Sequence, residues 1–128
     1  MLLIIDTHAW IEYFLGSKKG EVFQKLFQDD KNTFLTIECC LAEIKGWSLK
    51  NNKDFSELFK IIRSNSRIVT INGYDWIDAV AIRFEQRKSH KNFGLFDAML
   101  LVKQHEFNCK IISGDHHFKH IKDVIFLE

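Results

Sequence analysis

Five short apolar runs, separated by stretches of helical periodicity, constrain the fold of this chain more than any other feature of its sequence. The runs are Leu2–Ile5, Phe34–Ile37, Arg67–Ile71, Lys110–Ser113 and Val124–Leu127. Short continuous apolar runs are typical of strands that helices cover on both faces, and the third run alternates and is rich in β-branched residues. Strands that alternate with helices form mainly parallel sheets. The sequence therefore predicts an α/β fold with a mainly parallel central sheet and helices on both faces.

The stretches between these runs carry apolar residues at helical spacing. They predict helices around residues 10–15, 22–27, 41–47, 55–62, 76–84 and 97–107. Gly16 is expected to end the first helix, and Gly46 is a weak point in the third. Asn72, with Asp75 three residues later, resembles the start of the fifth helix. On that helix the residues expected to face inward are Trp76, Ile77, Val80, Ala81 and Phe84, with Arg83 and Arg87 nearer the other side.

The length and composition favour one domain over residues 1–128, without a membrane span. No proline, repeat or low-complexity segment marks a linker, and no apolar run approaches the roughly 20 residues that a bilayer requires. The start, MLLIID, lacks the basic region of a signal peptide, so a cytoplasmic location is expected. The three cysteines lack the spacing of a disulfide framework or of a common zinc site, which favours reduced and mostly buried thiols.

Three aspartates and one glutamate stand out by their positions. Asp6 ends the first predicted strand, and Asp115 follows the fourth strand after one glycine. Asp97 opens the last predicted helix, and Glu43 lies on an earlier helix among apolar neighbours. Each aspartate alone fits a helix cap, and Glu43 alone fits a boundary residue with its carboxylate in solvent. However, the functional cleft of a parallel sheet lies beyond the carboxyl ends of its strands, where these acids would meet.

Together, the four acids favour a metal site. Carboxylates in one cleft repel each other strongly in a medium less polar than water, so they need protons or a positive charge among them. Oxygen ligands, with no histidine or cysteine required, suit Mg²⁺ or Mn²⁺. A divalent ion held by carboxylates is typical of enzymes that cleave phosphodiesters, because the ion polarises the phosphate and lowers the pKa of a bound water.

Three segments of the sequence resemble the PIN domain family. They are LLIIDTHAWIEYF at the start, TIECCLAEIKG in the middle and FGLFDAMLLVKQHEFNCKIISGDHHFKHIKDVIFLE at the end. The resemblance runs from residue 1 to 128, with residues 48–92 matched only loosely, and the spacing of the acids is similar to that of VapC-type ribonuclease toxins. It implies a parallel sheet between helices, which the alternation of strands and helices predicts independently.

The resemblance also implies roles for the four acids. Asp6, Asp97 and Asp115 would hold a Mg²⁺ or Mn²⁺ ion, some of them through water. Glu43 would bind metal or orient the attacking water.

Four further residues near the acids either match the family or depart from it. Thr7 and Ser113 match small hydroxyl residues that are often found beside the acids, which implies hydrogen bonds to the metal ligands. His117 stands where some relatives have a further acid, which leaves open whether one metal ion binds or two. His8 is not a general family feature, and it either contacts substrate or packs locally.

The resemblance implies a metal-dependent endoribonuclease that acts as the toxin of a VapBC-type toxin–antitoxin pair. Such toxins commonly form homodimers and bind an antitoxin, a segment of which covers the cleft. A monomeric nuclease without a partner fits the sequence equally well, and a non-catalytic PIN-like module that binds RNA or protein is the main alternative. A phosphatase or a phospho-receiver lacks its motif, because Asp6 is followed by Thr7 and His8 and no lysine ends a late strand.

Basic side chains gather near two of the acids. Those that fit phosphate contacts on RNA beside the cleft are Arg83, Arg87, Lys88, Lys91, His116 and Lys119. An ordinary solvated surface fits the same residues, and the net charge of +1 decides nothing. His116 and His120 would approach a metal together only if that segment were helical, and no third ligand is evident.

Overall fold

The computed structural model describes residues 1–128 and has five strands in one parallel sheet. The strands are β1 (Leu2–Ile5), β2 (Thr33–Ile37), β3 (Arg67–Val69), β4 (Lys110–Ser113) and β5 (Val124–Phe126), in the spatial order β3-β2-β1-β4-β5. The helices are α1 (Thr7–Leu15), α2 (Lys18–Phe27), α3 (Glu38–Lys50), α4 (Phe55–Asn65), α5 (Gly73–Gln86) and α6 (Leu95–Phe107), with a short 3₁₀ helix, η1 (His116–Phe118). The α/β class and the parallel sheet predicted from the sequence are confirmed.

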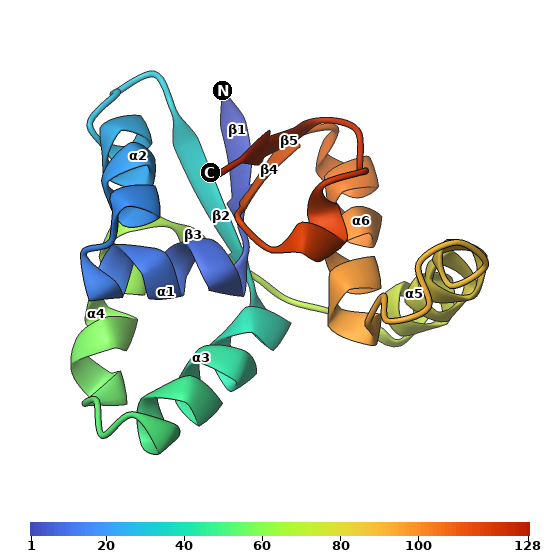
Figure 1. Cartoon of the computed structure of the whole chain (residues 1–128), viewed down its shortest axis with the longest axis horizontal. Helices are drawn as coiled ribbons and strands as arrows, with labels where there is room; N and C mark the ends of the chain where they lie inside the picture. Colours follow the sequence, from blue (N-terminus) through green and yellow to red (C-terminus); the bar gives the residue numbers. More distant parts are fainter.

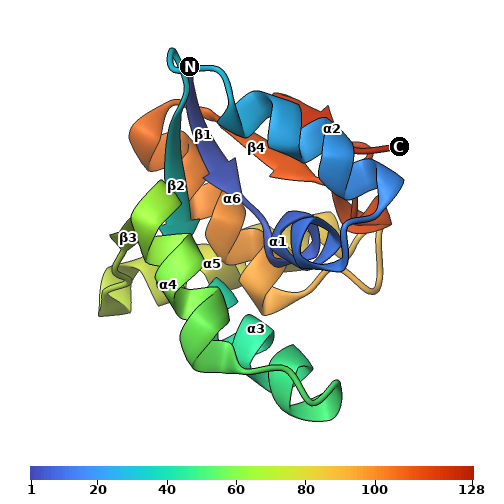
Figure 2. The same ribbon diagram turned by 90° about the vertical axis from the view of Figure 1, so that its left-hand side faces the viewer.

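Two apolar cores lie on the two faces of the sheet. Leu3 and Ile5 of β1 pack in the core that includes residues of α1, α2 and α4, whereas Ile4 between them packs in the core of α6. This alternation follows from the period of two in a strand. Figures 1 and 2 show the same division, with α1, α2 and α4 on one side of the sheet and α5 and α6 on the other. None of the helices is both long enough and apolar enough to cross a membrane.

Most predicted element boundaries lie within a few residues of the observed ones, and the differences have local causes. Gly16 ends α1 with a left-handed backbone (φ 65°), as expected. The third strand is shorter than its apolar run because the backbone N–H of Ile71 donates to the Glu38 carboxylate at 2.7 Å instead of extending the sheet. Helix α3 continues through Gly46 without a break.

The inward face predicted for α5 is wrong for most of its members. Ile77, Val80 and Phe84 are 67%, 46% and 68% exposed, and Ala81 is exposed as well. Helix α5 is an outer helix that packs on α6 and not on the sheet. Only a narrow stripe of its side chains is therefore buried. That stripe contains Asp75 and Ala79.

A buried ion pair fixes the orientation of α5. Asp75 accepts from Lys103 of α6 at 2.8 Å, and both side chains are buried. The hydrogen bonds of Asn72 and Lys103 lower the pKa of Asp75. With this pair on the buried side of α5, the exposed side carries the apolar residues Tyr74, Ile77, Val80 and Phe84, and we refer to them as the α5 apolar face.

Candidate active site

Asp6 lies at the carboxyl end of the central strand β1, where the chain turns into α1. Its side chain is 5% exposed and makes no capping hydrogen bond with α1, so it does not act as an N-cap. Instead, the Ser113 hydroxyl at the end of the neighbouring strand β4 donates to Asp6 Oδ2 at 2.6 Å. The parallel pairing of β1 with β4 places the two side chains at the same edge of the sheet.

Asp115 reaches the same edge through the turn that follows β4. Its backbone N–H donates to Ser113 Oγ at 3.0 Å, and its Oδ1 accepts from the backbone N–H of His117 at 2.9 Å. Asp115 therefore caps the short helix η1, and the helix-cap interpretation offered in the sequence analysis is correct for this residue. Gly114 lets this turn pass close to the His8 imidazole, because a Cβ at position 114 would lie only 2.8–2.9 Å from atoms of that ring.

Glu43 approaches from α3, on the other side of Asp6. The Thr7 hydroxyl, one residue after Asp6, donates to Glu43 Oε1 at 2.7 Å. Helix α3 begins directly after β2, whose carboxyl end lies beside that of β1, so the second turn of α3 carries Glu43 to the edge. Thr7 and Ser113, which the family resemblance placed beside the acids, both contact them. Thr7 contacts the carboxylate of Glu43, and Ser113 contacts the carboxylate of Asp6 and the backbone N–H of Asp115.

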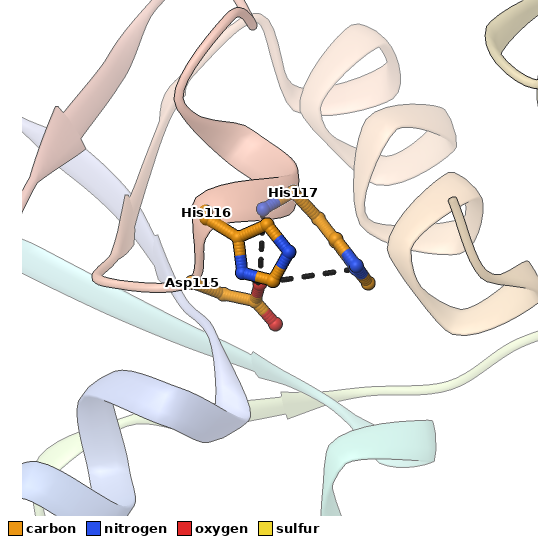
Figure 3. Close-up of side chains that lie close together, drawn as sticks. All are labelled: Asp115, His116 and His117. Atoms are coloured by element: carbon orange, nitrogen blue, oxygen red, sulfur yellow. Dashed lines mark hydrogen bonds and ion pairs between the residues drawn. The ribbon is translucent and has the colours of Figure 1, made fainter. Parts of the chain in front are cut away.

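Asp97 belongs to the first turn of α6. Its Oδ2 accepts from the backbone N–H of Gly94 at 2.8 Å, which ties the carboxylate to the helix start. The same oxygen lies 2.9 Å from His117 Nδ1, and this nitrogen is also 3.8 Å from Asp115 Oδ1. His117 therefore connects Asp97 and Asp115, and Figure 3 shows its ring beside Asp115 and the neighbouring His116.

The charges of the four acids act on one another. Burial raises the pKa of Asp6 to about 7, against the lowering effect of the Ser113 hydrogen bond, and the negative charges of three neighbours raise it further: Glu43, Asp115 and Asp97. The pKa of Glu43 is also raised, first by loss of solvent around its carboxylate and then by the negative charges of Asp97 and Asp115. The residue as a whole is nevertheless exposed. These effects on Asp6 and Glu43 indicate that the four carboxylates lie near one another at the carboxyl edge of the sheet, which is the place predicted for the cleft.

The donor set of this cleft fits a divalent metal ion. No lysine or arginine forms an ion pair with any of the four acids, and only histidines lie within ion-pair distance of Asp97 and Asp115. Ligand atoms of Asp115, His116 and His117 lie within 4.8 Å of one another. A cation among carboxylate oxygens would offset the repulsion that raises the pKa of Asp6.

The basic residues predicted to contact RNA lie on α5, on the loop after it and around η1. Most are exposed: Arg87, Lys88, Lys91, His116 and Lys119, with Arg83 half-buried. Arg87 has a structural contact, because its Nε donates to the Phe93 carbonyl at 2.7 Å. Lys88 pairs with Glu85 at 3.1 Å.

The remaining histidines do not form a second metal site. His120 stacks on His90, with ring centroids 3.5 Å apart, and does not join His116. His8 lies 3.6 Å from Glu12 through Nε2, and its Nδ1 is buried without a hydrogen-bond partner. Sequence reasoning treated His117 only as a departure from the family pattern and missed its contact with Asp97.

The PIN domain family model matches residues 3–124, which include all four acids and every strand of the sheet except the first residue of β1 and the last two residues of β5. The chain belongs to the PIN domain family. The nucleases of this family generally depend on a divalent metal ion. The resemblance seen in the sequence is confirmed, and the acid cleft lies within the matched segment.

Solved structures share the fold of this PIN domain along its whole length. VapC20 of Mycobacterium tuberculosis, a sarcin–ricin loop cleaving toxin, has a TM-score of 0.80 at 13% identity, with 98% of this chain and 99% of that chain covered. The VapBC2 complex of Rickettsia felis, bound to a DNA fragment from its promoter, gives 0.74 at 17% identity, with 98% and 97% covered. A toxin–antitoxin complex from Klebsiella pneumoniae gives 0.69 at 17% identity, with 98% of both chains covered. No curated protein sequence matches the chain.

Proposed function

We propose that this PIN domain is a metal-dependent endoribonuclease that hydrolyses RNA phosphodiester bonds with Mg²⁺ or Mn²⁺ held by four acids. The observation that carries the proposal is that Asp6, Glu43, Asp97 and Asp115 lie near one another at one edge of the sheet, without a lysine or arginine paired to any of them. Protein cavities avoid such a concentration of negative charge unless a cation or protons offset it.

Each residue of the cleft has a distinct task in the proposed reaction. Asp6, Asp97 and Asp115 would hold the ion, and Ser113 orients Asp6 for this purpose through its 2.6 Å hydrogen bond. Glu43, held by Thr7, would bind metal or orient the attacking water. When bound, a divalent ion supplies charge that polarises the phosphate and lowers the pKa of a bound water.

The structural neighbours support a proposal for the partner of this chain. Three of them are VapC toxins or VapBC complexes, and this supports our proposal that the chain is the toxin of such a pair and binds a cognate antitoxin. We place its action in the cytoplasm, where cellular RNA is available, and we propose that residues 1–128 work as a single domain. Exposed basic residues at the end of α5 and around η1 would contact phosphates and position the RNA strand.

The test of the proposal is RNA cleavage by the purified protein with Mg²⁺ or Mn²⁺. Incubation with structured and single-stranded RNAs is expected to give discrete products on a sequencing gel, and EDTA is expected to abolish them. The non-catalytic alternative predicts a different result, in which Mn²⁺ binds by calorimetry while no RNA of a varied panel is cut. That second result would replace the nuclease by a binding module.

The α5 apolar face fits a symmetric contact with a second copy of this chain. Its residues are 46–80% exposed and contiguous on one helix, which is typical of an interaction surface. If two α5 helices pack antiparallel about a twofold axis between Val80 and Ala81, residues at equal distance from the axis meet. Ile77 then lies opposite Phe84, and Asp78 lies opposite Arg83, so apolar and charged groups are both matched. We therefore propose a homodimer through α5.

Replacing Ile77 with aspartate is expected to convert a dimer into a monomer, because it buries a charge in the apolar centre of the proposed contact. Light scattering coupled to size-exclusion chromatography measures the mass directly. Leu49→Asp is the matched control, since Leu49 on α3 is equally exposed, at 67%, and lies outside α5. A wild-type protein that is monomeric at micromolar concentration, or an Ile77→Asp variant that stays dimeric, contradicts the homodimer.

A further inference from the structure

We infer that His117 is a metal ligand of this cleft, and that its imidazole nitrogen biases the site toward Mn²⁺ over Mg²⁺. The inference rests on the proposed metal site and adds a nitrogen donor to the carboxylates. It concerns a residue that the family resemblance marked as a departure, since an acid occupies this position in some relatives.

The backbone holds His117 in place from both sides. Its N–H donates to Asp115 Oδ1 at 2.9 Å, and the next residue, Phe118, is fully buried in the core. The ring lies near Phe93, with centroids 6.4 Å apart, and the side chain is 25% exposed. In contrast, the adjacent His116 side chain is 84% exposed. His117 is thus a positioned ring at the edge of the cleft and not a mobile surface histidine.

The position of the Nδ1 atom of His117 supports its role as a metal ligand. His117 Nδ1 is 2.9 Å from Asp97 Oδ2 and 3.8 Å from Asp115 Oδ1, and the second distance is too long for a hydrogen bond. The nitrogen therefore stands between oxygens of two of the proposed ligands, which come from α6 and from the turn after β4. An ion bound by both carboxylates would lie within reach of this nitrogen, so a small ring movement completes the ligand set. The atoms of Asp115, His116 and His117 are close enough to share an ion.

The change from a carboxylate to an imidazole alters metal preference. Mg²⁺ prefers oxygen ligands in near-ideal octahedral geometry, whereas imidazole suits first-row transition metals. With His117 as a ligand, the site also has one negative charge fewer than it would have with an aspartate at this position. We therefore expect this protein to bind Mn²⁺ at least about tenfold more tightly than Mg²⁺, and we expect His117→Asp to narrow that ratio by about tenfold.

Pulsed electron paramagnetic resonance of bound Mn²⁺ tests the inference without any measurement of activity. A directly coordinated imidazole gives a characteristic ¹⁴N coupling, which is expected in the wild-type protein and in His116→Gln. The coupling is expected to disappear in His117→Gln. If that variant fails to fold, a protein in which every histidine except His117 is glutamine must retain the coupling.

Two results would overturn the inference. One is a wild-type protein that binds Mn²⁺ without a ¹⁴N coupling, which would make His117 a hydrogen-bond partner of Asp97 only. The other is a coupling that persists in a folded His117→Gln protein. These outcomes are separate from failure of the proposed function, because the coupling is measured without RNA, whereas the nuclease proposal fails when metal-loaded protein leaves RNA intact.

Discussion

Replacing Asp6 or Asp97 with asparagine is expected to reduce RNA cleavage by at least about 1000-fold while the fold stays intact. Asparagine has nearly the same shape as aspartate but lacks the charge that holds the ion, and loss of a metal-dependent transition-state interaction of about 4 kcal/mol corresponds to a factor of this size. The Asp97 variant keeps an oxygen that can accept from the Gly94 N–H, so α6 retains its start. Single-turnover cleavage of a fluorescent RNA measures the effect.

The control for this experiment is Asp30→Asn, because Asp30 is exposed and lies before β2, at the opposite edge of the sheet from Asp6. Circular dichroism and thermal unfolding show whether each variant is folded. If folded Asp6→Asn or Asp97→Asn cleaves RNA as fast as the wild-type protein, the assignment of these acids to the catalytic site is wrong.

The stability of the ion-free protein is expected to fall as the pH rises from about 4 to about 7. The ordinary pKa of an aspartate is 3.8, and burial is the main reason why the pKa of Asp6 rises to about 7 in the folded protein. Between these values the folded protein keeps a proton that the unfolded chain has lost, so each rise in pH favours unfolding. The difference corresponds to a loss of up to about 4 kcal/mol in the free energy of unfolding, complete once the pH exceeds 7.

Metal and mutation are both expected to remove this loss. Mn²⁺ added at pH 8 should raise the unfolding temperature, because an ion that binds only the folded state stabilises it. Asp6→Asn should stabilise the EDTA-treated protein at pH 8 and have little effect at pH 4. Denaturant unfolding across this pH range, with and without EDTA, measures both effects. Equal pH profiles for the wild-type protein and Asp6→Asn in EDTA would show that the pKa of Asp6 is not raised in the folded protein.

The sheet was predictable because its signals are local. Leu2–Ile5 is apolar throughout, and Lys110–Ser113 has two isoleucines at its centre, as is typical of strands covered on both faces. The structure confirms both strands. The orientation of α5 was not predictable from periodicity. Ile77 and Phe84 form a regular apolar stripe, but the buried Asp75–Lys103 pair joins residues from two helices and turns that stripe outward.

The sequence also predicted that the acids would lie at one edge of the sheet, but it did not predict the individual hydrogen bonds between their side chains and neighbouring residues. Asp6 and Asp115 follow adjacent parallel strands, so topology alone brings them to one edge. The hydrogen bond between His117 and Asp97 joins residues 20 positions apart on a turn and a helix. Its existence depends on how η1 sits against α6, for which no spacing rule exists.

The most direct test of the shared cation is a crystal structure of the protein soaked in Mn²⁺, with anomalous diffraction used to locate the ion. We predict an anomalous peak bound by carboxylate oxygens of Asp6, Asp97 and Asp115, with Glu43 either bound to the ion or bound to its water. An ordered Mn²⁺ elsewhere on the molecule with this cleft empty, or no peak at millimolar Mn²⁺, would contradict the account.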